Sequence, residues 1–172
     1  MKELLRLGAI LAVLGVAAFG FVYLQMKKGY ALKVGEPAPA FALPTLDGNP
    51  TDLATLRGRV VLVNLWASWC PPCLIEMPSL QRLHQKLAAD GLVVLGVSAD
   101  DDEKEIRKVL AKIPVSFPIL RDPEGRMANQ YRATGYPETY LVDKQGVLQA
   151  TFIGPMEWDS PEVVTRIRHF LH

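Results

Sequence analysis

Cysteine and histidine are scarce in this sequence. Its 172 residues include two cysteines, Cys70 and Cys73, and three histidines. A disulfide-rich scaffold needs several cysteine pairs spread along the chain, so that class of small secreted protein is excluded. Internal repeats and low-complexity tracts are absent as well. The two cysteines therefore need an explanation other than a disulfide framework.

A strong excess of charge of either sign is also missing. The whole chain carries a formal net charge of +1, and residues 29–172 hold fifteen Lys or Arg against seventeen Asp or Glu. A protein that binds nucleic acid through phosphate contacts needs a basic surface, so we expect no nucleic-acid partner. The content of 49% hydrophobic and 22% charged residues is too apolar for a disordered chain. Residues 29–172 are numerous enough to bury a core of their own.

One long hydrophobic run stands near the N-terminus. Residues 7–26 carry no formal charge, and Lys27 and Lys28 end the run. A helix of this length spans about 30 Å, the thickness of the hydrocarbon core of a bilayer. We therefore predict a transmembrane anchor within residues 1–28, followed by one domain in residues 29–172. A cleaved signal peptide is the alternative, because residues 16–18 are small, and basic residues on both sides leave the orientation open.

The order of the predicted elements indicates an α/β domain. Two apolar runs, residues 60–66 and 92–97, are typical of strands buried on both faces. A helix over residues 70–90 joins them in a β-α-β unit with a right-handed crossover. The other expected elements are a short edge strand at 41–43, helices at 52–56, 101–112 and 124–131, strands at 117–120, 139–142 and 147–153, and a helix that begins at Pro161. Together they predict a central mixed sheet flanked by helices.

An acidic run, residues 100–103, precedes the helix predicted at 101–112. Negative side chains are favourable at the N-terminus of a helix, where they interact with its dipole. We expect no further role for this run.

The two cysteines lie where the first buried strand is expected to turn into the first long helix. Cysteines three residues apart on a first helical turn share a face and are close enough for a disulfide. Pro71 and Pro72 suit this position, because the first helical residues need no N–H partner. Free N–H groups at the helix start stabilise a thiolate and lower the pKa of its thiol. We therefore predict a redox pair in which Cys70 is the nucleophile and Cys73 is the resolving thiol.

Other uses of a C-x-x-C pair have less support. A zinc site needs two further ligands, and His84, His169 and His172 lack paired spacing. Attachment of c-type haem needs a His after the second cysteine, where this chain has Leu74. A Cu(I)-binding delivery module stays an alternative, although no cluster of His or Met would add ligands. We expect neither a metal nor a cofactor.

Residues 60–78 resemble the thioredoxin superfamily through the motif Trp66-Ala67-Ser68-Trp69-Cys70-Pro71-Pro72-Cys73 and through Pro78. Residues 35–43 and 135–143 are similar to its membrane-anchored extracytoplasmic branch, the TlpA/ResA/CcmG(DsbE)-like thiol-disulfide oxidoreductases. The resemblance implies a thioredoxin fold with an N-terminal extension and a helix-strand insert, preceded by one transmembrane helix. It also implies that Pro78 kinks the active-site helix.

The resemblance further implies residues that shape the site. Pro137 would be a cis proline that faces the cysteines, and Tyr136 would offer backbone groups to an extended substrate. Glu138 matches an acid of the CcmG-like subgroup. It would tune the thiols or contact the substrate, with a surface strand carboxylate as the alternative. We expect Trp66 and Trp69 to flank the site, one packed in the core and one shielding the second cysteine. For Trp158 we expect packing alone.

One departure from the superfamily concerns the proton of Cys73. Ordinary thioredoxins have a buried Asp six residues before the first cysteine, where this chain has Asn64. Glu76, three residues after Cys73, matches an acid of the resembling branch and shares a helical face with that cysteine. We predict that Glu76 exchanges the proton of Cys73. A solvated helix carboxylate is the alternative.

The resemblance implies a reductase on the periplasmic side of the cytoplasmic membrane. Strongly oxidising relatives carry a His between the cysteines, which Pro71 and Pro72 replace here. The expected partners are a disulfide-containing protein substrate, such as apocytochrome c during cytochrome c maturation, and a CcdA/DsbD-type membrane thiol transporter as electron donor. A disulfide donor for other envelope proteins is one alternative. A peroxiredoxin-type peroxidase is another, but Val63 and Ala67 occupy the Pro and Thr positions of its Pro-x-x-x-Thr-x-x-Cys signature.

Overall fold

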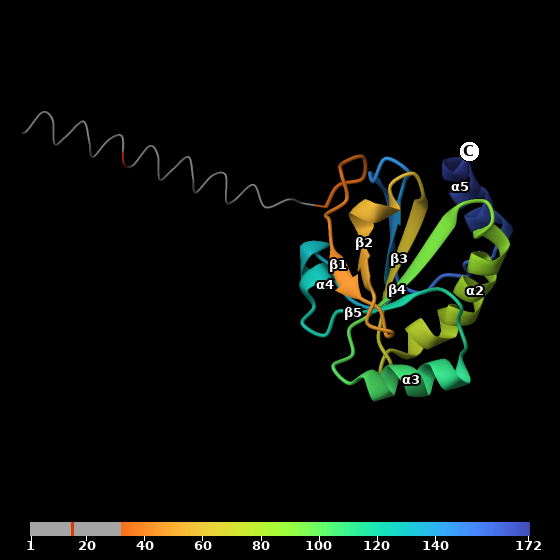
Figure 1. The fold of residues 1–172 in the computed structure, drawn as a ribbon. Coiled ribbons are helices and arrows are strands. Elements are labelled where there is room, and N and C mark those ends of the chain that lie inside the picture. The colour runs from red at the N-terminus through yellow and green to blue at the C-terminus, as the bar shows by residue number, and fades with distance from the viewer. Residues whose placement is uncertain (1–14, 16–31) are drawn as a thin grey trace, which may run out of the picture. The chain divides into compact units, whose positions relative to one another are not determined.

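Five strands form a mixed sheet at the centre of a computed structural model, which describes Gly15 and residues 32–172 (Figure 1). Their order is β5-β4-β3-β6-β7. Strands β3, β4 and β5 are parallel, β6 is antiparallel to β3, and β7 is antiparallel to β6. The strands are β3 (Val60–Trp66), β4 (Leu92–Ser98), β5 (Ile119–Arg121), β6 (Glu138–Val142) and β7 (Leu148–Ile153). Every residue of β3 is buried, which confirms the central strand predicted from its apolar run.

Helices cover both faces of this sheet. One face packs against α2 (Pro71–Leu87), α3 (Glu103–Lys112) and α5 (Pro161–Leu171). The other face packs against a small hairpin, β1 (Ala42–Pro44) and β2 (Pro50–Asp52), the 3-10 helix η1 (Leu53–Leu56) and α4 (Arg126–Gln130). Figure 1 shows α2 and α5 on one side of the sheet, with β1 and α4 on the other. Alternate residues of β3 belong to two separate hydrophobic clusters, because successive strand residues point to opposite faces.

This architecture confirms the predicted thioredoxin fold, with two local differences. The strand expected at residues 41–43 pairs with β2, for which no strand was predicted. Strand β2 consists of Pro50, Thr51 and Asp52 and is exposed or half-buried, so it carries no alternating apolar pattern. The helix predicted over residues 70–90 ends at Leu87 and contains Pro78.

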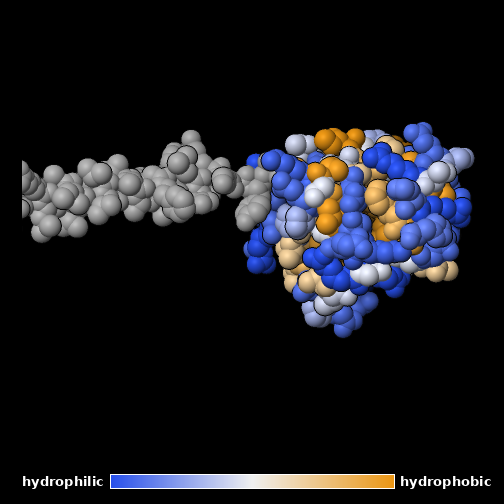
Figure 2. Space-filling model, turned by 90° about the horizontal axis from the view of Figure 1, so that it is seen from above, coloured by the Kyte–Doolittle hydropathy of each residue, from blue (hydrophilic) through white to orange (hydrophobic). Residues whose placement is uncertain are grey.

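Residues Leu32–His172 form one compact unit. On the side of this unit away from α3, polar side chains cover most of the surface and the apolar areas are small and separate (Figure 2). Apart from Gly15, the transmembrane anchor predicted at residues 7–26 lies outside the described residues, as does the domain boundary predicted after residue 28. Among the residues that the structure describes, no helix is long and apolar enough to cross a membrane.

Candidate active site at the start of the first long helix

Cys70 and Cys73 form a disulfide where β3 turns into α2. Their sulfur atoms are 2.07 Å apart and their Cα atoms 5.4 Å apart. Cys70 is the N-cap of α2, and its sulfur accepts a hydrogen bond from the backbone N–H of Cys73 at 3.3 Å. Pro71 and Pro72 fill the first two helical positions, as predicted. Cys70 is 4% exposed and Cys73 is 0% exposed, so Cys70 is the cysteine that a disulfide of another protein can reach first.

The loop before Cys70 is held by Asp100. The carboxylate of this buried residue accepts hydrogen bonds from the backbone N–H of Ser68 at 2.9 Å and from the hydroxyl of Ser98 at 2.7 Å. Our expectation that residues 100–103 act only on a helix dipole is therefore wrong for Asp100. The residue that caps α3 is Asp102, which accepts from the backbone N–H of Lys104. Asp100 instead follows the end of β4, beside the loop that leaves the neighbouring strand β3.

Glu76 lies inside the protein, one helical turn after Cys73. It is 2% exposed, and three donors contact its carboxylate. Asn64 Nδ2 donates to Oε1 at 2.8 Å, while the backbone N–H of Met156 and Trp158 Nε1 donate to Oε2 at 2.9 and 3.0 Å. Burial raises the pKa of Glu76, and the hydrogen bonds from Met156, Asn64 and Trp158 oppose this rise only in part. The alternative of a solvated helix carboxylate is wrong.

Asn64 links Glu76 to the sheet. Its side-chain Nδ2 also donates to Thr139 Oγ1 at 2.8 Å, and the two residues are register partners on β3 and β6. Both are 1% exposed. Asn64 therefore uses its side-chain amide to hold the Glu76 carboxylate. It occupies the position at which ordinary thioredoxins have an Asp.

The segment before β6 contacts Trp69, the residue that precedes Cys70. The Tyr136–Pro137 peptide bond is cis, as the resemblance implies. The Trp69 and Tyr136 rings meet edge to face with centroids 5.6 Å apart, and Trp69 directly precedes Cys70. Trp69 is 63% exposed, whereas Trp66 is completely buried in the core. The Trp69 ring, packed against Tyr136, therefore presents an exposed aromatic surface one residue before the disulfide.

Glu138 is buried on the other face of the sheet. It is 3% exposed, and its carboxylate accepts from the Thr134 backbone N–H at 2.9 Å and from the Tyr140 hydroxyl at 2.8 Å. Its neighbour Thr139 points toward Asn64, so Glu138 points away from Glu76. The surface-carboxylate alternative is wrong, and the structure does not bring the two carboxylates together. Glu138 instead fixes the segment that carries Pro137.

Sequence reasoning missed the contribution of the segment after β7. Trp158, for which we expected packing alone, donates to Glu76 from 82 positions along the chain. Its backbone N–H also donates to the hydroxyl of Ser79 on α2 at 3.1 Å. No local pattern reveals a contact between residues so far apart, because it depends on how β7 returns the chain to α2.

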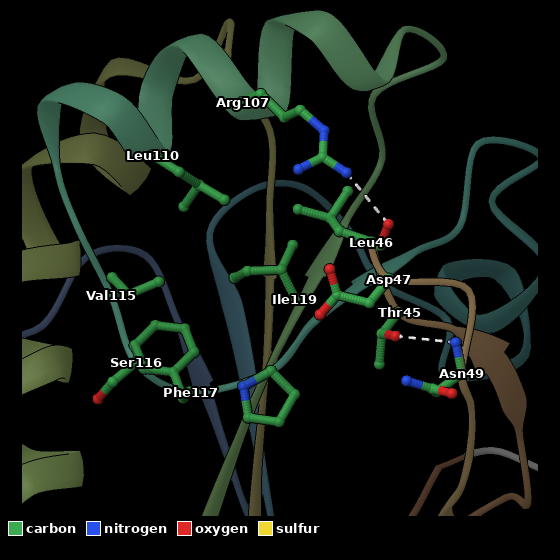
Figure 3. A pocket seen from close by; sticks show the side chains of 11 residues that line it. Thr45, Leu46, Asp47, Asn49, Arg107, Leu110, Val115, Ser116, Phe117 and Ile119 are labelled. Atoms are coloured by element: carbon green, nitrogen blue, oxygen red, sulfur yellow. Dashed lines mark hydrogen bonds between the residues drawn. The ribbon is translucent and has the colours of Figure 1, made fainter.

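Grooves also lie away from the disulfide within residues 32–172, and two of them are lined in part by α3. One, of about 250 Å³, runs beside the start of α2 and is lined by Ser68, Leu74 and five residues of α3 and its C-terminal end. The other, of about 410 Å³, lies between residues 45–49, α3 and residues 115–119 (Figure 3). There Arg107 donates to the Leu46 carbonyl across one end. Within the described part of the chain, no group of three or more His, Cys, Asp or Glu residues is placed to hold a metal ion.

Comparisons with known proteins identify the family of this chain. The AhpC/TSA family model matches residues 34–151. The thioredoxin-like protein YneN of Bacillus subtilis (strain 168) is 37% identical over 150 residues, which cover 86% of this chain and 87% of that protein. The thiol:disulfide interchange protein DsbE of Pseudomonas fluorescens biotype C is 35% identical over 170 residues, which cover 96% of this chain and 91% of that protein.

A solved structure is similar as well. The crystal structure of a Chlorobium tepidum protein that bears the name thiol:disulfide interchange protein DsbE has a TM-score of 0.77 and 32% sequence identity, and the match covers 83% of this chain and 100% of that one. These relatives indicate the same class of protein as the fold and the disulfide at the start of α2 do. The chain belongs to the AhpC/TSA family and is a thiol-disulfide oxidoreductase of the DsbE/ResA type, and its Cys70–Cys73 disulfide fits a C-x-x-C redox site.

Proposed function

We propose that this protein reduces disulfides in client proteins outside the cytoplasmic membrane, and that the oxidised C-x-x-C pair of apocytochrome c is such a client. The observation that carries the proposal is the arrangement of one slightly exposed cysteine, one fully buried cysteine and one buried acid at the start of α2. The name of the DsbE relative supports a thiol-disulfide interchange role. The absence of a His between Cys70 and Cys73 supports the reducing direction.

The reaction consists of two thiol-disulfide exchanges. The Cys70 thiolate attacks one sulfur of the client disulfide, and the S–S bond of the client breaks. The second client sulfur leaves as a thiolate and takes up a proton, while Cys70 stays joined to the client in a mixed disulfide. The Cys73 thiolate then attacks the Cys70 sulfur, and the client leaves with its second thiol. The client has gained two electrons and two protons, and the protein has lost both as it forms the Cys70–Cys73 disulfide.

Glu76 serves the second exchange. The thiol of Cys73 is completely buried, so a proton acceptor inside the protein is needed when its thiolate forms. Glu76 stands three residues further along the same helix and is also buried. Burial raises the pKa of its carboxyl, which brings it closer to the pKa of a thiol and so favours proton exchange between the two groups.

The remaining predicted residues act on the client. Trp69 offers an exposed ring beside Cys70, and the backbone at Tyr136 and Pro137 would pair with an extended client segment. Glu138 acts indirectly, because it holds the Thr134 end of that segment. This assignment replaces the idea that Glu138 tunes the thiols.

Membrane attachment and the electron donor complete the proposal. The apolar run at residues 7–26 supports an anchor in the cytoplasmic membrane. A membrane thiol transporter of the CcdA/DsbD type would restore the dithiol by the reverse sequence of exchanges, since each turnover leaves a disulfide between Cys70 and Cys73.

Trapping of the mixed disulfide tests the client. A Cys73→Ser variant lacks the resolving thiol, so it should accumulate a covalent adduct with a peptide that carries an oxidised C-x-x-C-H segment. Cys70→Ser is the matched control and should give no adduct. A peptide with an unrelated disulfide measures selectivity. Equal trapping of both peptides would replace the apocytochrome assignment with general disulfide exchange, and the absence of any adduct would contradict the proposed reaction.

A further inference from the structure

We infer that Trp158 is a positioning residue for Glu76, whose indole N–H holds one carboxylate oxygen in place and thereby sets the pH at which the buried Cys73 can pass its proton. The inference deepens the proposed function and rests on the proton exchange assigned there to Glu76. Trp158 acts through Glu76 and takes no part in the exchange of sulfur partners.

Trp158 is fixed to α2 by its main chain and by its side chain. Its indole Nε1 lies 3.0 Å from Glu76 Oε2, and its backbone N–H donates to Ser79 Oγ at 3.1 Å. The Ser79 hydroxyl donates in turn to the Glu76 carbonyl at 2.8 Å. The indole is completely buried and meets the ring of Phe152 on β7 edge to face, with centroids 5.2 Å apart. These contacts leave the indole N–H aimed at a single carboxylate oxygen.

The groups around the Glu76 carboxylate are neutral. In the described part of the chain its hydrogen-bond partners are Asn64 from β3, the Met156 backbone and Trp158. From β6, Thr139 contacts the Asn64 amide, and on α2 itself the titratable neighbour is Cys73.

The charged side chains on either side of Trp158 form ion pairs with Arg82. Arg82 of α2 bonds Glu157 at 2.8 Å and Asp159 at 2.6 Å, with more than half of the Arg82 side chain exposed. The ionised form of Glu76 is therefore stabilised by N–H dipoles, and a hydrogen bond to a charged group is among the stronger ones. Loss of one donor should make the carboxylate retain its proton to higher pH.

The chain contains a matched control for this donor. Trp66 is also completely buried and belongs to the same hydrophobic cluster as Trp158. Its indole N–H has no hydrogen-bond partner among the described residues. Trp66→Phe and Trp158→Phe therefore remove comparable parts of a buried ring, but only the second variant removes a hydrogen bond to Glu76.

The test follows the two phases of thiol release when the reduced full-length protein reacts with dithiobis(nitrobenzoate) at a series of pH values. The second phase reports attack by Cys73. Trp158→Phe should move the acidic limb of this phase to higher pH by about one unit, a tenfold rate loss on that limb, whereas Trp66→Phe should leave its midpoint in place. In a Glu76→Gln background Trp158→Phe should cause no further shift.

The possible results separate the two proposals. If Glu76→Gln shifts the profile and Trp158→Phe behaves like Trp66→Phe, the positioning role is wrong and the role of Glu76 stands. If Glu76→Gln itself leaves the profile unchanged, the role of Glu76 fails, and the inference fails with it. Should Trp158→Phe not fold, the indole N–H signal of Trp158 in the otherwise unaltered protein decides by NMR. The chemical shift of this signal should change with pH as the Glu76 carboxyl titrates, and this change should be absent in Glu76→Gln. A chemical shift that does not change with pH, or that changes in the same way in Glu76→Gln, would contradict the inference.

Discussion

Cys70 and Cys73 have different surroundings although they share one disulfide. Cys70 caps α2 and is slightly exposed, whereas Cys73 is completely buried one turn before the carboxylate of Glu76. This difference in exposure supports the proposal that Cys70 makes the first attack on a client and that Cys73 needs an internal proton acceptor.

The buried acid predicts a pH-dependent stability. Because burial raises the pKa of Glu76, the folded protein binds this proton more tightly than the unfolded chain does. The free energy of unfolding should therefore fall as pH rises from the unfolded pKa, about 4.3, through the raised folded pKa. Glu76→Gln removes this dependence, so the oxidised variant should gain stability relative to the unaltered protein over that range.

Urea denaturation at a series of pH values measures this difference. Gln85→Ala, which removes an exposed neutral side chain from the same helix, is the control and should keep a constant difference from the unaltered protein. A constant difference for Glu76→Gln as well would show that the two states bind the Glu76 proton equally, against our account.

Trp69 predicts a separation between client binding and stability. Its ring is 63% exposed and meets Tyr136 edge to face, so Trp69→Ala should raise KM for a disulfide peptide several-fold. The free energy of unfolding should change by no more than about 1.5 kcal/mol, the upper value for such a ring pair. Val34→Ala is the control, because Val34 is similarly exposed, at 61%, but lies far from the cysteines. The next residue, Gly35, donates a backbone hydrogen bond to Leu148 at the opposite end of the sheet. An unchanged KM in Trp69→Ala would remove Trp69 from the client surface.

At the element scale, buried acids join the ends of neighbouring strands to the site. Asp100 links the end of β4 to the loop that leaves β3, and Glu138 links the start of β6 to residue Thr134 before it. The first loop leads directly to Cys70, and the segment before β6 carries Tyr136, whose ring meets that of Trp69. The position of Cys70 thus depends on contacts between elements as well as on the start of α2.

Asp100→Asn tests this link. The substitution removes the charge and places an amide donor opposite the N–H and hydroxyl donors of Ser68 and Ser98, so it should lower the free energy of unfolding by about 1–3 kcal/mol. Asp101→Asn changes an exposed neighbour and should have little effect. Chemical denaturation of both variants measures the difference, and equal stability of the two would mean that Asp100 does not hold the loop.

For the whole molecule, local patterns predicted the α/β domain with its mixed sheet and the redox pair, and the family resemblance added the thioredoxin fold. The apolar runs of β3 and β4 and the Cys70–Cys73 spacing on α2 carry their information within a few residues. The sequence did not reveal the burial of Asp100 or the contact between Trp158 and Glu76, because these depend on residues brought together by the sheet. Strand β2 was missed for a different reason, since an exposed strand of three residues has no apolar alternation.

The reduction potential of the Cys70–Cys73 pair tests the central claim most directly. The full-length protein would be equilibrated in defined dithiol-disulfide buffers and followed by the fluorescence of Trp66 and Trp69, which lie four and one residues before Cys70. A reductant should give a value near or below about −230 mV, in the range of thioredoxin-like reductants. A value near about −120 mV, like that of the oxidant DsbA, would contradict the proposed direction and make the protein a disulfide donor.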